Sequence, residues 1–207
     1  MKRPRFEAHN VVRLLAVALI LIAAAPAWVD QFVADYRPNG RSRSLDTSRC
    51  AKVMEKARTL SGAEIAYDPA YARIAYPSGD VPASQGVCAD VIVRSFRAAG
   101  IDLQRLVHED MEARFSAYPR LWSLRKTDPN IDHRRVPNLM TYFARNGAAL
   151  SLGGDFRPCD VVAWDLGEGV THIGLVTDKG TIVHHIGGRP AEEDVLRAWR
   201  IIGHFAF

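Results

Sequence analysis

Apolar residues recur with helical spacing through the first two thirds of the chain. In the segment 86–100 they fall every three to four positions, which predicts a helix with Cys88 in its first turn and Gly100 as its stop signal. The segments 63–85 and 101–137 are predicted to be mostly irregular, with patchy helix in the second. Two further helices are predicted, one from a cap at Asp46 or Thr47 to a stop at Gly62, and one over 138–146.

The last third of the chain changes to a period of two. Four runs rich in β-branched and aromatic residues are separated by glycine-containing turns, and they cover 160–166, 172–177, 181–186 and 199–207. Such closely spaced strands predict an antiparallel sheet. Helices followed by a sheet predict an α+β domain in which the helices pack on one face of the sheet.

The turn between two of these strands fixes which side chains share a face. The sequence 177–181 fits a three-residue hairpin loop in which Gly180 takes a positive φ. In that register His172 and His184 lie diagonally on one face, and His185 points to the other. A two-residue loop would reverse the choice between His184 and His185.

The amino terminus has the layout of a secretory leader. Residues 1–27 combine a basic start, an apolar run and a small-x-small site, which predicts cleavage after Ala27. The alternative is an uncleaved anchor spanning 11–29. Residues 28–45 are polar and are predicted to be a linker, and 46–207 the folded domain. The domain is therefore expected to be exported to the periplasm or cell envelope, with membrane contact only through the leader.

Composition and charge narrow the class of partner. The chain has 207 residues, 48% hydrophobic and 24% charged, which suits one globular domain. Its formal net charge is +4, but the leader holds four basic residues and one acidic residue, which leaves the remainder at +1. A nucleic-acid partner is not expected, because its binding needs a basic excess in the folded part.

The three cysteines bear on redox state and metal binding. An odd number in an oxidising compartment leaves one thiol unpaired within the chain. If Cys88 is that thiol, Cys50 and Cys159 are left as candidates for a disulfide, and the sequence leaves open whether they are close enough. One cysteine with two histidines matches a catalytic zinc site in number, but the short Cys-x-x-Cys spacing is missing, so no metal or cofactor is expected.

Cys88 is the leading candidate nucleophile. Unpaired N–H groups and the positive end of the helix dipole gather at a helix start and favour the thiolate. An inert buried cysteine is the alternative. Thiol-based acyl transfer also needs a proton acceptor and a group that orients it, and His172 and His184 can supply these roles.

The order of these residues resembles the papain-like fold of NlpC-type cell-wall peptidases. The resemblance rests on Asp160 opening an apolar strand, on His172 beginning His-x-Gly, and on His184 twelve positions later. It implies Cys88, His172 and His184 as a catalytic set. It also implies Tyr76, twelve positions before the cysteine, as a hydroxyl that lines the site. The sequence around Cys88 departs from the Asp-Cys-Ser-Gly pattern, and Cys159 replaces the glycine before Asp160.

A closer resemblance covers residues 67–207, which are similar to the bacterial family called domain of unknown function 1287. It implies a papain-like fold without an established substrate. The matching pieces are Tyr67-Asp68-Pro69, Gly79-Asp80-Val81-Pro82, Gly86-Val87-Cys88, the 107–111 and 130–139 segments, Ile182-Val183-His184-His185-Ile186-Gly187 and Gly203-His204.

A charged run, Asp132-His133-Arg134-Arg135, adds candidate binding residues. Arginine suits bidentate capture of carboxylates, which cell-wall peptides carry, so Asp132, Arg134 and Arg135 are predicted to contact substrate. The alternative is a solvated loop or a scaffolding salt bridge.

Taken together, these features predict an exported thiol hydrolase, an endopeptidase or amidase, that cleaves an amide bond in cell-wall peptide. The alternative is a catalytically inactive envelope module that binds such a peptide or a protein partner. Turnover retained after exhaustive chelation would separate a thiol enzyme from a zinc enzyme.

Overall fold

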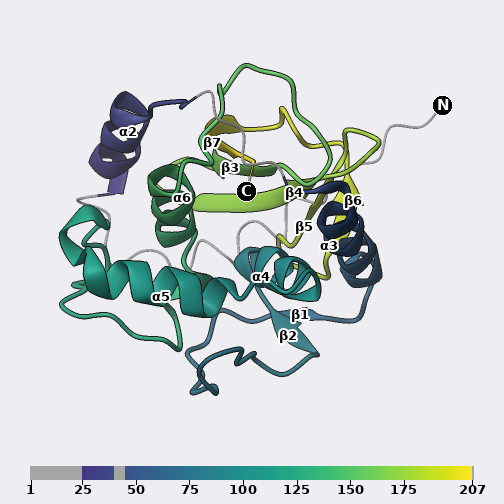
Figure 1. The fold of residues 1–207 in the computed structure, drawn as a ribbon, viewed down its shortest axis with the longest axis horizontal. Coiled ribbons are helices and arrows are strands. Elements are labelled where there is room, and N and C mark those ends of the chain that lie inside the picture. Colours follow the sequence, from purple (N-terminus) through teal and green to yellow (C-terminus); the bar gives the residue numbers. More distant parts are fainter. Residues whose placement is uncertain (1–24, 40–44, 207) are drawn as a thin grey trace.

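The fold is α+β, with helices gathered on one face of an antiparallel sheet (Figure 1). The computed structural model describes residues 25–39 and 45–206. The leader prediction for 1–24 lies outside the described residues. None of the described helices is both long enough and apolar enough to cross a membrane.

The predicted helices are present, and besides a helix at residues 25–35, which is described below, one further helix is added. Asp46 caps the second helix, accepting the Arg49 N–H at 2.9 Å. The added helix, α5, was predicted only as patchy structure, and its buried stripe includes Leu103, Val107 and Met111. The helices are α2 (Ala25–Asp35), α3 (Thr47–Leu60), α4 (Cys88–Ala98), α5 (Leu103–Ala113) and α6 (Val136–Arg145), with 3-10 turns η1 (Phe115–Ala117) and η2 (Asp132–Arg134).

The main sheet has five strands in the order β6-β5-β4-β3-β7, with antiparallel neighbours. The predicted hairpin register is confirmed: Leu175 pairs with Val183, the Thr177 N–H donates to Thr181 at 2.8 Å, and Gly180 has a φ of +76°. The strands are β3 (Val161–Asp165), β4 (Thr171–Val176), β5 (Ile182–His184), β6 (Ala191–Glu193) and β7 (Arg200–Phe205), beside a parallel pair β1 (Ala66–Tyr67) and β2 (Gln85–Gly86).

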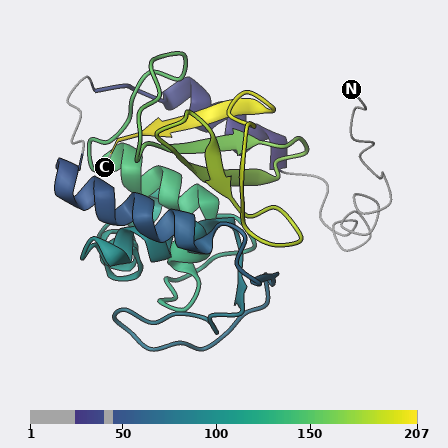
Figure 2. The same ribbon diagram turned by 90° about the vertical axis from the view of Figure 1, so that its right-hand side faces the viewer.

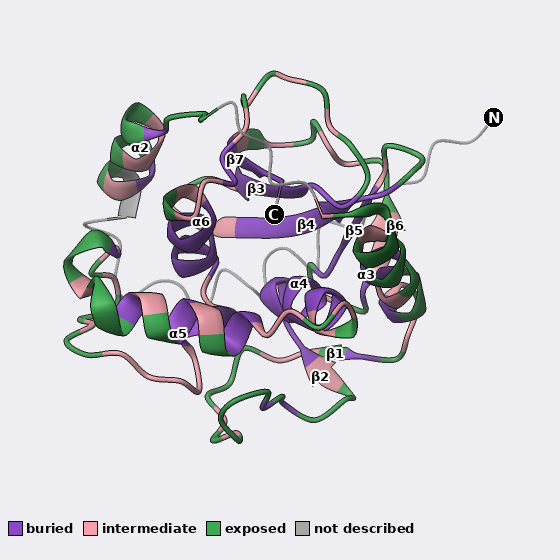
Figure 3. Ribbon diagram, in the orientation of Figure 1, coloured by how far each residue is buried: buried purple, intermediate pink, exposed green. Residues whose placement is uncertain are grey.

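The two faces of the sheet carry separate apolar clusters. Ile173, Leu175 and Val183 belong to the large core that includes α4, which is almost entirely buried (Figure 3). Trp164 and Ile182 project from the opposite face, where partly buried residues near the end of the chain cover them. Side chains next to each other along β4 therefore enter different environments.

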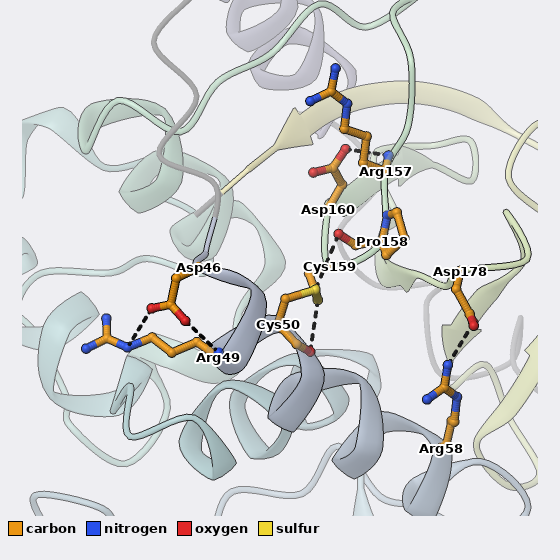
Figure 4. Close-up of a disulfide and its surroundings, with 9 residues drawn as sticks. All are labelled: Asp46, Arg49, Cys50, Arg58, Arg157, Pro158, Cys159, Asp160 and Asp178. Atoms are coloured by element: carbon orange, nitrogen blue, oxygen red, sulfur yellow. Dashed lines mark hydrogen bonds and ion pairs between the residues drawn. A yellow bond between two sulfur atoms is a disulfide. The ribbon is translucent and has the colours of Figure 1, made fainter.

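A disulfide fastens α3 to the segment entering β3 (Figure 4). It joins Cys50 and Cys159, whose Cα atoms are 5.8 Å apart, within the usual range for such a bond. The candidate pairing from the sequence is thus present. Cys88 is the free cysteine of the described residues.

The linker predicted for 28–45 is wrong over its first part. Residues 25–35 form α2, which packs beside β7 (Figure 2). Val29 is buried, and the Tyr36 hydroxyl donates to the His204 carbonyl and accepts the His204 N–H. Apolar residues at helical spacing hold this segment on the domain. The polar residues between them are the reason why the sequence suggested a linker. The predicted cleavage point after Ala27 falls within α2.

Candidate functional site

Cys88 is the first residue of α4 and lies against the sheet. The residue is 5% exposed and packs in the same apolar cluster as Ile173 of β4. Asp90 accepts the Val87 N–H at 2.7 Å and so caps the start of the helix. The amino end of α4 thus presents the sulfur to the main chain of β4.

Burial, and not the helix start, decides the protonation of this thiol. Loss of solvent raises the pKa of Cys88 to about 12, and the charge of Asp90 adds to the effect. The backbone N–H groups lower the pKa, as expected for a helix start, but they do not offset burial. The thiolate predicted from the sequence is therefore not the form that the described structure favours.

Alkylation of the native protein without reductant should label Cys88 alone, and slowly. Since its pKa is raised to about 12, the thiolate fraction should rise about tenfold per unit between pH 7 and 10, and the iodoacetamide rate with it. Mass spectrometry of peptides would measure both site and rate, with Cys88→Ser as the control. A rate that levels off near pH 7 would show that the thiol is already ionised.

Two histidines and a glutamate form a hydrogen-bonded chain on the other face of the sheet. His172 Nε2 is 2.8 Å from His184 Nδ1, and His184 Nε2 is 2.8 Å from Glu193 Oε2. The prediction that the two histidines share a face is confirmed. Glu193, on β6, was missed, because the sequence does not reveal which carboxylate the strand order brings to His184.

The environment of His172 keeps its imidazole neutral. The ring stacks on Trp164, with centroids 5.8 Å apart, and meets the edge of Trp199. Burial lowers the pKa of His172 to about 3, and the charges of His184 and His185 act in the same direction. Among the described residues, none makes a hydrogen bond to Nδ1 of His172.

Cys88 and His172 lie on opposite faces of β4, and no hydrogen bond joins them among the described residues. The thiol reaches Ile173 from the α4 side, while the His172 ring projects from the face that carries Trp164. The β4 and β5 strands pair only at 175–176 with 182–183, so their ladder ends before His184.

Tyr67 and His185 occupy the Cys88 side of the sheet. Their rings meet edge to face with centroids 5.1 Å apart. Burial raises the pKa of Tyr67, and the charges of Cys88 and Asp90 raise it further; Tyr67 also packs against the apolar cluster that contains Cys88. Tyr67 was missed as a site residue, although it opens the Tyr67-Asp68-Pro69 piece shared with the family.

The structure does not bring Tyr76 to the thiol. Its ring is 42% exposed and meets His108 of α5 edge to face, with centroids 5.2 Å apart. Its nearest charges, including Glu109 and Glu112, also belong to α5. The contact with α5 argues against the role that the resemblance implies for Tyr76.

Arg134 lies in a buried ion pair, which argues against its predicted contact with substrate. Its Nε and Nη2 donate to Asp90 at 3.0 Å, and its remaining donors reach the carbonyls of Ala70 and Asp68 at 3.2 Å. The side chains of Arg134 and Asp90 are 2% and 4% exposed. A buried acid in the first turn of α4 needs a buried cation, and Arg134 supplies it.

Asp132 is fully buried and holds His108, which argues against direct substrate contact. Its Oδ2 is 2.9 Å from His108 Nδ1 and accepts the Asp128 N–H at 2.7 Å. Arg135 differs from its neighbours. Its guanidinium lies 4.7 Å over the Trp122 ring, and its buried Nη1 has no partner among the described residues.

Two hollows adjoin the candidate site. One of about 640 Å³ lies between the β1–β2 pair and the 188–189 loop. The second, of about 220 Å³, is lined by His184 and Glu193 among others, and it shares Gly188 and Arg189 with the first. In the described part of the chain, no group of three or more His, Cys, Asp or Glu side chains is placed to hold a metal ion.

Comparison with known proteins places the chain in a family. It belongs to the family described as domain of unknown function 1287, whose model matches residues 54–207. It is 45% identical over 164 residues to the "Uncharacterized protein YijF" of Escherichia coli (strain K12), across 75% of this chain and 80% of that protein. No solved structure matches.

Proposed function

We propose that this protein is an exported thiol hydrolase of the papain-like, NlpC-type class that cleaves an amide bond in cell-wall peptide. One observation carries the proposal. A free cysteine at the first turn of α4 lies against β4, the strand whose opposite face carries the His172–His184–Glu193 chain of hydrogen bonds. Nucleophile, base and orienting group thus follow the chain order and the element types of that class.

The proposed reaction begins from a neutral pair. The Cys88 proton passes to Nδ1 of His172 as the sulfur attacks the substrate carbonyl carbon, and His172 then gives this proton to the leaving amine. The thioester that remains is hydrolysed by water. The backbone N–H of Cys88 and the Tyr67 hydroxyl, in place of Tyr76, are our candidates for donors to the oxyanion.

The described state is the resting state of this proposed mechanism. Cys88 and His172 lie on opposite faces of β4 in this state, so the proposed proton transfer requires a rearrangement of β4 when substrate binds. The hollow lined by His184 and Glu193 is where we propose that substrate first binds. Burial raises the pKa of the thiol, but once substrate excludes water it also strengthens the electrostatic interactions that stabilise the transition state.

The test compares products from defined cell-wall fragments. Wild-type protein and the Cys88→Ala variant are incubated with peptidoglycan fragments, and the products are read by mass. Cleavage of one amide bond by the wild type alone would support the proposal. The leader and the envelope substrate together predict export to the periplasm or cell envelope, and fractionation of cells would test that location.

A binding module without catalysis is the second candidate. The pKa of about 12 at Cys88 and the missing Cys88–His172 hydrogen bond in the described state favour it. Such a module would retain fragments with equal affinity in the wild type and in Cys88→Ala, and would release them unchanged.

Replacing Arg135 with glutamine should raise KM about tenfold and change kcat little. Its guanidinium has a buried donor, Nη1, that lacks a partner among the described residues, so it can bind a substrate carboxylate. A contact that is equally strong in the ground state and in the transition state changes KM alone. Initial rates on a cell-wall peptide would measure it. Arg125→Gln, at an exposed position nearby, is the control, and unchanged kinetics with a lower melting temperature would assign Arg135 to scaffolding.

A further inference from the structure

We propose that Glu193 is a positioning residue that sets the direction of the hydrogen bonds along Glu193–His184–His172 and so leaves Nδ1 of His172 free to accept a proton. The placement of the protons rests on the hydrogen-bond geometry and on the burial of the two rings. Its catalytic consequence rests on the proposed function. Glu193 lies on β6, outside the three residues to which the sequence assigns catalysis.

Strand pairing brings Glu193 to the right face. In the β5–β6 ladder, His184 pairs with Ala191 and Ile182 pairs with Glu193, so Glu193 and His184 are diagonal neighbours on one side of the sheet. The Glu193 side chain is about half exposed, at 49%, while His184 is 1% exposed. The carboxylate therefore lies at the solvent end of a chain whose other members are buried.

The carboxylate fixes the tautomer of each ring in turn. An ionised carboxylate only accepts hydrogen bonds, so His184 Nε2 must carry the proton that joins it to Glu193. A neutral imidazole holds one ring proton, which leaves His184 Nδ1 as an acceptor. His172 Nε2 must then donate to it, and Nδ1 of His172 keeps its lone pair.

Two observations support this assignment of neutral rings. Burial is the main cause that lowers the pKa of both His172 and His184. No residue in the described ranges hydrogen-bonds to His172 Nδ1, the nitrogen left as acceptor. A proton that arrives there would create a buried imidazolium beside Trp164 and Trp199, and the Glu193 charge at the end of the chain would compensate it.

The next residue along β6 offers a matched control. Glu192 faces the opposite side of the sheet, where its Oε1 accepts from Thr181 Oγ1 at 2.6 Å and lies 3.3 Å from Lys179 Nζ. It has the same charge and the same strand as Glu193, but it does not touch either histidine. A general effect of removing a carboxylate from β6 would therefore appear in both variants.

The experiment measures proton positions and turnover in the full chain. Histidine is labelled with ¹⁵N, and ring nitrogen shifts are recorded at neutral pH for wild type, Glu193→Gln, Glu193→Asp and Glu192→Gln. We expect protonated Nε2 on both His172 and His184 in the wild type. In Glu193→Gln, His184 should show a mixture of tautomers, because an amide can donate as well as accept.

Turnover of cell-wall fragments should follow the proton positions. Glu193→Gln should lower kcat by about 10- to 100-fold, within the range of general acid–base effects, and Glu193→Asp should recover part of the loss. Glu192→Gln should leave both shifts and rates unchanged. A wild-type His184 protonated at Nδ1, or a Glu193→Gln variant with wild-type tautomers and rates, would overturn the inference. The expected tautomers with no turnover in any variant would instead overturn the proposed function alone.

Discussion

Replacing Cys88 with alanine should remove nearly all hydrolysis of cell-wall fragments, and replacing His172 with alanine should do the same. The sulfur cannot attack without a group that takes its proton, so the two residues act as one unit. Each single change should cost on the order of 10³-fold or more in kcat, and the double variant should be little worse than either. Initial rates from mass analysis of the products would measure this.

The controls separate chemistry from folding. His184→Ala should leave measurable activity, because an orienting group sets the tautomer and angle of His172 without entering the reaction. The melting temperature of each variant is measured first, and rates are compared only for variants whose melting temperature lies within a few degrees of the wild type. Full activity in Cys88→Ala would eliminate the thiol mechanism, and additive losses in the double variant would show that Cys88 and His172 do not cooperate.

His185 lies near the candidate site, although the hairpin register points it away from His184. The register places His185 on the face opposite His184, and the structure confirms this. That face is the one on which Tyr67 and Cys88 lie. Pointing away from His184 therefore does not remove His185 from the site, and its buried ring packs beside the tyrosine that we propose for the oxyanion.

The sequence was most informative where interactions are local. Gly180, with its positive φ, and the three-residue loop determined the pairing of β4 with β5, and from it the contact of His172 with His184. Asp46, a good N-cap, marked the start of α3. These features depend on backbone preferences over a few residues, so they can be predicted without knowing the rest of the fold.

Features that depend on distant segments could not be predicted in the same way. Glu193 meets His184 because β6 joins the edge of the sheet, and Tyr67 reaches Cys88 through the two-residue pairing of β1 with β2. The burial that raises the pKa of Cys88 depends on how α4 packs, whereas its helix-start position was visible in the sequence. Local patterns thus identified the reactive groups but not their surroundings.

Helix α2 shows the same limit at the amino terminus. Its apolar stripe, with Val29 and Val33, is buried only because the helix packs against the domain beside β7. Without that partner the segment has the composition of a tether, since charged and polar residues separate its apolar positions. Packing against the domain therefore overrides the polar character that suggested a linker.

Replacing Arg134 with glutamine should destabilise the domain by about 3–5 kcal/mol, because it leaves Asp90 as a buried charge without its partner. For a domain of this size, that loss lowers the melting temperature on the order of 10 °C. Asp90 also caps the start of α4 by accepting the Val87 N–H. Loss of the Asp90–Arg134 pair should therefore also disturb the helix start at which Cys88 lies. Calorimetry would measure the melting temperature, and denaturant titration the free energy of unfolding.

Two variants decide whether the buried ion pair is the cause. Arg58→Gln breaks an exposed pair with Asp178, at 2.8 Å, and should cost at most about 1 kcal/mol. The double variant Asp90→Asn with Arg134→Met removes both charges, and it should recover much of the stability that Arg134→Gln loses, because no uncompensated charge remains buried. A melting temperature for Arg134→Gln close to wild type, with a raised KM, would instead restore Arg134 as a substrate-binding residue and show that Asp90 is solvated when the protein works.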